Sequence, residues 1–366
     1  MKKFKGESIF LIIVIILSFF GVLAIYSASN YSAEKEFGSK YYFSNKQLIG
    51  FAIGLIALIF TANYNYKNYK KFTIPLVVIS LLILILVFVK GVGQESYGAK
   101  RWIKLGPITL QPSEIAKFAF IFFVSAYYSK NPTRGFKLVS SIPVIVVGGI
   151  YCLLIILEPN MSITVCFGLL LVTLLYLGGL PIKYFIIILI VATLFIPILI
   201  IAEPYRLKRL SAFINPWKNP QGEGYQLIQS LYALGSGGLF GVGFLKSRQK
   251  YKFLPFSESD FILSIIGEEF GYLGVVILFV LLFYLIIKCY KIASRSKDYY
   301  GFLIASGIGT IFFLQVSINA LVVSGSIPPT GLPLPLISCG NTSLIVYMAA
   351  FGIVYNISKE SDKLTL

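Results

Sequence analysis

Long apolar runs alternate with short polar segments along the whole chain. A transmembrane helix needs about 20 mostly apolar residues to cross the hydrocarbon core of a bilayer. Runs of about that length lie at 9–26, 47–63, 73–90, 113–129, 138–157, 161–180, 184–202, 261–287, 301–323 and 343–357. The pattern predicts an all-α polytopic membrane protein with about ten transmembrane helices and a long loop at 203–260 between helices seven and eight. We expect residues 1–366 to form a single membrane domain.

Two boundaries in this pattern depend on a few residues. The run 9–26 is longer than the apolar core of a signal peptide, and no small-residue cleavage pattern follows it, so we expect it to remain as the first span. The runs 138–157 and 161–180 are separated only by Glu158-Pro159-Asn160, where the proline interrupts the helical pattern.

Composition supports the membrane assignment, because 57% of the residues are hydrophobic, only 13% are charged and the mean hydropathy is +0.82. The lysines and arginines of short loops predict orientation, since cytoplasmic loops carry the excess of them. If the N-terminus is cytoplasmic, every inner segment carries lysine or arginine. We therefore expect both termini in the cytoplasm and the loop 203–260 to be extracytoplasmic.

The net charge of +17 exceeds what this topological signal requires. The rest of the positive charge lies in outer segments, in AKRWIK (99–104), RLKRL (206–210) and KSRQKYK (246–252). These segments can face anionic lipid headgroups or an anionic substrate, and the charge alone favours neither. Nucleic acid is not expected as a partner, because the segments lie outside the cell.

The chain contains no histidine, so imidazole is excluded as a general base and as a metal ligand. Proton transfer must therefore use carboxylates, lysine or tyrosine. The four cysteines show no CxxC spacing and are scattered by the topology, so neither a disulfide nor a protein-bound metal site is indicated.

The stretch FLPFSESDFILSIIGEEFG, residues 253–271, is unusually acidic for the start of an apolar helix. Its proline and serines predict that Asp260 lies at the outer N-terminus of helix eight, where it could simply cap the helix. Helical periodicity places Ser264 and Glu268 on the same face as Asp260, with Glu268 about 12 Å deeper. Glu269 points roughly the opposite way, and for it we favour a structural ion pair.

Three other segments combine polar and apolar residues in unusual ways. Glu114 and Lys117 are three residues apart on one helix and within reach of each other, either as a structural pair or in the lining of a polar groove. Arg101 beside Trp102 fits interfacial anchoring or a grip on a phosphate. The segment 327–343 holds four prolines, which predicts an irregular lip around a binding site, because such backbone is tolerated at membrane depth only where protein buries it or a wet cavity adjoins it.

Six ordered motifs resemble one known family. GAKRW, LQPSEIAK, NPWKNPQGEGYQLIQS, LGSGGLFGVG, SDFILSIIGEEFGYLG and GLPLPLIS are similar to motifs of the SEDS family of cell-wall glycosyltransferases, from about residue 8 to residue 357. GVGQESYGAKRW and YQLIQSLYALGSGGLFGVGFLKSRQK are closer to the FtsW branch, which serves cell division, than to the RodA branch, which serves elongation. The sequence departs from the family at LPFSESD, which lacks a glutamate and a His-Thr pair, and at EPNMS, where Asn160 replaces an aspartate.

The resemblance implies an inverting peptidoglycan glycosyltransferase that polymerises lipid II, the undecaprenyl-diphosphate-linked disaccharide. The family's essential aspartate corresponds to Asp260, the expected catalytic base. Cations near the leaving diphosphate should supply much of the rate. We expect substrate contacts from Arg101, Trp102, Glu114, Lys117, Arg206, Arg209, Glu258, Ser264, Glu268, Pro333 and Ser338. No tightly bound cofactor is expected, although a divalent cation, Mg²⁺ or Mn²⁺, could share the role of the cations.

The implied partners are lipid II, a class B penicillin-binding protein of the FtsI type, other division proteins and membrane lipids. The implied location is the bacterial inner membrane, at the division site. Three alternatives stay open at this point: an elongation polymerase of the RodA type, a flippase for the lipid-linked precursor, and a non-catalytic scaffold for a penicillin-binding protein. A flippase would place functional polar residues at both membrane faces, whereas here they gather at the outer one.

Overall fold

The computed structural model describes residues 2–89, 91–96, 99–105, 108–201 and 203–363. Its α-helices in chain order are α1 (Lys2–Phe37), α2 (Tyr42–Asn63), α3 (Thr73–Leu86), α4 (Pro112–Lys130), α5 (Leu138–Leu157), α6 (Met161–Leu177), α7 (Lys183–Ile201), α8 (Pro204–Ile214), α9 (Tyr225–Ser236), α10 (Ile262–Arg295), α11 (Tyr299–Val323) and α12 (Asn341–Lys363). Short 3₁₀ helices occupy η1 (Tyr66–Phe72), η2 (Pro132–Phe136) and η3 (Pro216–Lys218).

Each of the ten predicted apolar runs coincides with a helix, and α8 and α9 lie in the loop 203–260. Among the described residues, seven helical segments are long and apolar enough to cross a membrane. They are Glu7–Phe37, Tyr42–Asn63, Tyr66–Leu86, Leu138–Leu157, Ile262–Arg295, Tyr299–Val323 and Asn341–Ser361. The all-α polytopic class is confirmed, while the count of ten spans and the single-domain assignment stay predictions.

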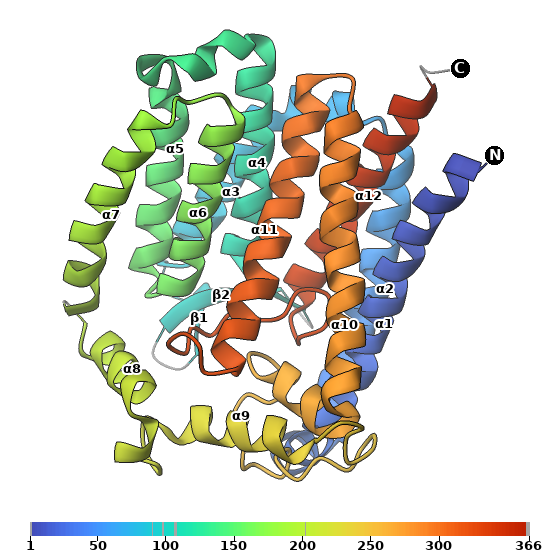
Figure 1. The fold of residues 1–366 in the computed structure, drawn as a ribbon, viewed down its shortest axis with the longest axis vertical. Coiled ribbons are helices and arrows are strands. Elements are labelled where there is room, and N and C mark those ends of the chain that lie inside the picture. Colours follow the sequence, from blue (N-terminus) through green and yellow to red (C-terminus); the bar gives the residue numbers. More distant parts are fainter. Residues whose placement is uncertain (1, 90, 97–98, 106–107, 202, 364–366) are drawn as a thin grey trace.

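The long helices form an upright bundle with both termini at one end, and α8, α9 and the loop that follows α9 lie at the other (Figure 1). Aromatic side chains fill part of the core. Phe351 of α12 meets Phe10 of α1 and Phe312 of α11 edge to face, with ring centroids 5.6 and 5.0 Å apart. The termini and the long loop therefore belong to opposite ends of the molecule.

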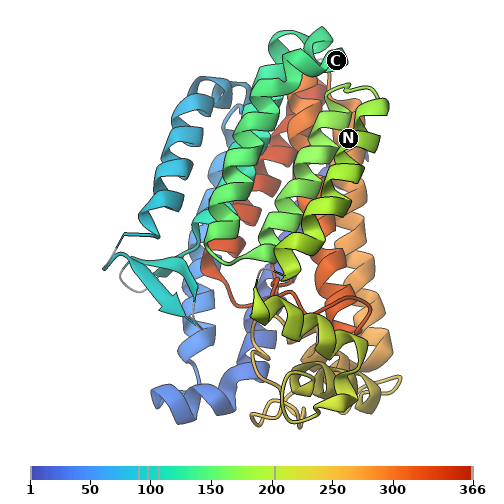
Figure 2. The same cartoon turned by 90° about the vertical axis from the view of Figure 1, so that its left-hand side faces the viewer.

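A small antiparallel sheet, which the sequence analysis did not predict, precedes α4. It has the order β1 (Gly93–Ser96), β2 (Ala99–Leu105) and β3 (Ile108–Leu110), with an irregular register between Gln94 and Glu95. The sheet projects beside the bundle near the foot of α3 (Figure 2). Arg101 and Trp102 lie on its central strand rather than in a loop, so strand pairing fixes their backbone.

Helices α2 and α12 approach each other closely because small residues lie between them. Gly50 and Gly54 of α2 face Asn341 and Met348 of α12. Gly352 of α12 lies against the α2 backbone, where an added Cβ would be 2.5 Å from the Leu58 carbonyl oxygen. In a bilayer, such close contact replaces the hydrophobic driving force that lipid cannot provide.

Helix α10 contains a break that the apolar pattern did not reveal. Gly271 has φ 67° and ψ −169°, so Ile262–Phe270 and Tyr272–Arg295 are separate helical segments. Glycine is required here, because the conformation disfavours a side chain and an added Cβ would clash with the Gly241 backbone nitrogen. The short first segment is thereby free to take its own direction at the site end.

We predict that Gly352→Ala destabilises the protein by about 1–3 kcal/mol, although alanine favours a helix, because the new methyl group overpacks the contact between α2 and α12. Gly168→Ala on α6 is the matched control, since nothing lies within 4 Å of its added Cβ. Thermal unfolding in detergent should show a lower Tm for Gly352→Ala only. Equal Tm values for the two variants would contradict tight packing at Gly352.

Candidate functional site

Asp260 lies two residues before α10 and does not cap it. The residue at the cap position is Phe261, and no side chain accepts a capping hydrogen bond there. The prediction that Asp260 is a simple helix cap is therefore wrong. Its backbone is instead fixed by Asn319 of α11, whose Nδ2 donates to the carbonyl oxygens of Asp260 at 2.8 Å and of Leu332 at 2.7 Å.

The proline-rich segment 327–340, here called the lip, is free of regular helix, as predicted. Ser338 joins it to the loop before α10, because its hydroxyl donates to the Ser259 carbonyl oxygen at 2.6 Å and accepts from the Leu334 amide at 2.8 Å. The Cys339 amide donates to the Glu258 carbonyl oxygen at 2.9 Å. Ser338 thus positions the backbone next to Asp260.

Gly331 brings the lip against two opposite charges. A Cβ at this position would lie 3.2 Å from Asp260 Oδ2 and 3.9 Å from Arg209 Nη1. Arg209, on α8, also donates from Nη1 to the Pro329 carbonyl oxygen at 2.7 Å. The carboxylate, the guanidinium and the lip backbone therefore meet at one place, and the φ of +75° at Gly331 favours glycine there.

The two carboxylates of this loop have perturbed acidities. Burial raises the pKa of Asp260 to about 6, although the positive charges of Arg209 and Arg101 oppose the shift. Burial also raises the pKa of Glu258, and the negative charge of Asp260 adds to that shift. Near neutral pH, Asp260 is thus an ionised carboxylate whose pKa is close to the working range of a general base.

Arg101 reaches the site from β2 and holds the turn between α5 and α6. Its Nε donates to the Glu158 carbonyl oxygen at 3.2 Å, and its Nη2 donates to the Pro159 carbonyl oxygen. At that turn Asn160 accepts a hydrogen bond from the Ile163 amide and so caps α6. The predicted break at Glu158-Pro159-Asn160 is confirmed.

Glu158 is a site residue that the sequence analysis used only as a boundary. It is fully buried, and neither carboxyl oxygen has a hydrogen-bond partner among the described residues. Burial raises the pKa of Glu158 to about 8, with the Arg101 charge opposing the shift. The signal was available, since a carboxylate at the end of an apolar span marks a functional position by default. Ser162, close by, donates to the Thr330 carbonyl oxygen and ties this turn to the lip.

Glu114 and Lys117 form the predicted contact inside α4, with Lys117 Nζ 2.7 Å from Glu114 Oε1. Both side chains are fully buried, and Glu114 Oε2 has no hydrogen-bond partner among the described residues. Lys117 Nζ also lies 5.8 Å from the ring centroid of Tyr347 on α12. The geometry is that of an ion pair between packed helices, and substrate contact by either residue stays a prediction.

The expected depth of Glu268 is wrong. It accepts hydrogen bonds from the Ser247 hydroxyl and the Arg248 amide, so it faces the long loop instead of the interior of a span. Ser264 does not line the Asp260 cluster either, because its buried hydroxyl lies 2.8 Å from that of Ser230 on α9. Both side chains join the long loop to the first segment of α10.

Glu269 forms the ion pair expected of it, with Lys250 Nζ 3.6 Å from its Oε1. The partner comes from the long loop rather than from another helix. The Ser27 hydroxyl of α1 donates to the same carboxylate at 2.6 and 2.8 Å. Glu269 thereby fastens the long loop to α1 and α10.

The remaining predicted residues surround the cluster without a side-chain contact that defines a role. Trp102 follows Arg101 on β2 and is half-buried. Arg206 lies one turn before Arg209 on α8, and Pro333 lies on the lip beside Leu332. Their substrate contacts stay predictions.

The described residues hold no group of three or more His, Cys, Asp or Glu side chains that could bind a metal ion. The protein groups around Asp260 therefore do not form a complete ligand set. We derive no step through a divalent cation, and its participation stays a prediction.

Comparison with known proteins identifies relatives over almost the full length. The FtsW/RodA/SpoVE family model, described as "Cell cycle protein", matches residues 7–363. The chain is 37% identical to "Probable peptidoglycan glycosyltransferase FtsW" of Trichlorobacter lovleyi, over 96% of this chain and 93% of that protein. It is 36% identical to "Stage V sporulation protein E" of Bacillus subtilis, over 98% of this chain and 99% of that protein.

Solved structures share the fold. A chain in the structure named "Structural coordination of polymerization and crosslinking by a peptidoglycan synthase complex" superposes with a TM-score of 0.78, at 26% identity and over 97% of both chains. The rod shape determining protein RodA of Thermus thermophilus superposes with a TM-score of 0.69, at 24% identity and over 96% of both chains. With a family model matched over 7–363 and relatives above 30% identity, this chain belongs to the FtsW/RodA/SpoVE family of cell cycle proteins.

Proposed function

We propose that this protein is a peptidoglycan glycosyltransferase that polymerises lipid II into glycan strands at the outer face of the bacterial cytoplasmic membrane. The single observation that carries the proposal is the half-buried Asp260 carboxylate, with a pKa of about 6, beside Arg209 and in the field of Arg101. The names of the relatives support the activity, since they include peptidoglycan glycosyltransferases of the FtsW type.

The chemistry follows from a base and cations in one place. Asp260 takes the proton of the 4-hydroxyl group of the acceptor GlcNAc, and that oxygen attacks C1 of the donor MurNAc. The C1–O bond to the lipid diphosphate breaks with inversion, and the diphosphate leaves with the bonding electron pair. Arg101 and Arg209 face the charge that develops on the leaving group, which lowers the barrier electrostatically.

Assembly and location are part of the same proposal. The similar chain in the peptidoglycan synthase complex supports a crosslinking partner, for which we propose a class B penicillin-binding protein of the FtsI type. The FtsW names favour septal wall synthesis with other division proteins over an elongation role. We place the Asp260 cluster on the extracytoplasmic side and both termini in the cytoplasm, in accordance with the basic inner loops.

Two other functions make different demands on the polar groups. A flippase needs charged groups that serve both membrane faces, whereas Asp260, Arg101 and Arg209 gather at the end of the bundle opposite the termini. A pure scaffold for a transpeptidase has no use for a carboxylate with a raised pKa between arginines. The arrangement therefore favours catalysis.

We predict that Asp260→Asn lowers polymerisation of labelled lipid II by at least 100-fold, because the amide cannot take up the proton. The protein should be purified with its cognate transpeptidase and glycan chains resolved on a gel. Glu34→Gln is the matched control, since it removes one exposed carboxylate that pairs only with exposed Lys40 at 3.6 Å. Thermal unfolding of all three proteins establishes equal folding.

The alternative outcomes are distinct. Equal polymer from the parent and Asp260→Asn would remove Asp260 as the base and direct attention to Glu258. If neither protein forms polymer but both bind lipid II, the flippase or scaffold function is favoured instead.

The pKa of Asp260 sets the expected pH dependence. The base must be ionised, so kcat/KM should fall about tenfold per pH unit below pH 6 and level off above it. Because the Arg209 charge favours ionisation, Arg209→Gln should move this acid limb to higher pH as well as lower the plateau. Arg209→Lys should keep the limb near pH 6. An unchanged limb in Arg209→Gln would show that another group controls the profile.

A further inference from the structure

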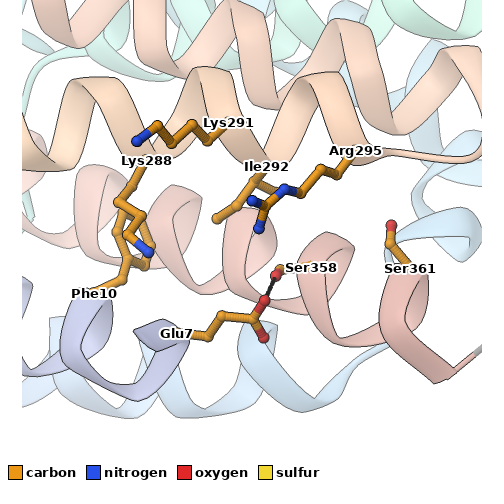
Figure 3. Close-up of a pocket in the computed structure, with 8 residues that line it drawn as sticks. All are labelled: Glu7, Phe10, Lys288, Lys291, Ile292, Arg295, Ser358 and Ser361. Carbon is orange, nitrogen blue, oxygen red and sulfur yellow. Dashed lines mark hydrogen bonds between the residues drawn. The ribbon is translucent and has the colours of Figure 1, made fainter. Parts of the chain in front are cut away.

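A cavity of about 120 Å³ lies at the end of the bundle that carries the termini, far along the chain from the Asp260 cluster. It opens between α1, α10 and α12, and Figure 3 shows the side chains around it. The lining consists of Glu7, Phe10, Lys288, Lys291, Ile292, Arg295, Ser358 and Ser361. Its volume is several times what one water molecule needs.

Three of the lining residues are cations on one helix. Lys288, Lys291 and Arg295 follow one another at spacings of three and four residues, so they share a face of α10. Among the described residues, no carboxylate lies within 4.0 Å of any of these three charged groups. The nearby Glu7 accepts a hydrogen bond from Ser358 at 2.5 Å instead (Figure 3). The cavity therefore carries an uncompensated positive charge.

The other walls of the cavity are suited to an amphipathic ligand. Phe10 is fully buried and Ile292 is nearly so, which gives the cavity an apolar side, while Ser361 adds a hydroxyl group. Along the same two helices toward the bilayer centre, Ile12 on α1 and Phe283 on α10 are exposed, as expected of side chains that contact lipid tails. A polar, cationic end thus continues into an apolar helix surface.

We propose that this cavity binds the phosphate-bearing headgroup of an anionic phospholipid of the cytoplasmic leaflet. Lys288, Lys291 and Arg295 neutralise the phosphodiester, Ser361 offers a hydrogen bond, and the acyl chains lie along α1 and α10. Cations in loops explain topology without any cavity, whereas these three line one together with apolar and hydroxyl groups. The proposal is independent of the glycosyltransferase activity.

Native mass spectrometry of the delipidated full-length protein tests the proposal by titration with phosphatidylglycerol. The triple variant Lys288→Gln, Lys291→Gln and Arg295→Gln should bind the first lipid roughly 100-fold more weakly, at about fivefold for each lost cation. The matched control is Lys71→Gln, Lys130→Gln and Lys137→Gln, which removes three exposed charges at the same end outside the cavity. This control should bind like the parent.

Further arms keep the result decisive. Ser361→Leu fills the cavity without changing its charge and should also weaken binding at least tenfold, which serves if the triple variant fails to fold. Phosphatidylcholine should bind the parent far more weakly than phosphatidylglycerol. Equal binding of the two lipids, or equal loss in the control triple variant, would overturn the proposal. Full displacement of phosphatidylglycerol by millimolar inorganic phosphate would assign the site to a free anion instead of a lipid.

Discussion

The hydrogen bonds between the lip and the loop before α10 are the constraint on which the candidate site depends. Neither segment has regular secondary structure, so neither could hold a charged group in place alone. Ser338 and Asn319 join the two segments through backbone carbonyl oxygens, including that of Asp260 itself. At membrane depth such backbone is tolerated only where protein satisfies its polar groups. The same bonds that make the lip possible therefore fix the carboxylate.

The acidity of Asp260 reflects a balance between two opposing effects. Burial disfavours the charged form, while Arg209 from α8 and Arg101 from β2 favour it, and burial is the larger effect. Because the two arginines come from different elements, the balance depends on the sheet and on the long loop being in place. A carboxylate with the same burial and no arginines would be protonated near neutral pH, as the raised pKa of Glu158 illustrates.

Helical periodicity and composition predicted the helices, the break at Glu158-Pro159-Asn160 and the irregular lip, because each depends on residues close together in the chain. The sheet was missed, since pairing of strands this short is set by tertiary contacts that periodicity does not reveal. The family resemblance supplied Asp260 and nominated both arginines, but no spacing could show that they meet at Gly331. The straight helix assumed for Glu268 was wrong because a single glycine, Gly271, is compatible with either a continuous or a broken helix.

The break at Gly271 has a mechanical consequence for the site. The first segment of α10 is fastened to the long loop and α1 through Glu268, Glu269 and their partners Ser247, Lys250 and Ser27. The second segment runs the length of the bundle and ends at the cationic cavity. Because regular helix does not continue through Gly271, the position of Asp260 is set by the loop and the lip rather than by the long segment. Contacts at the terminal end of α10 can then stabilise the bundle without displacing the carboxylate.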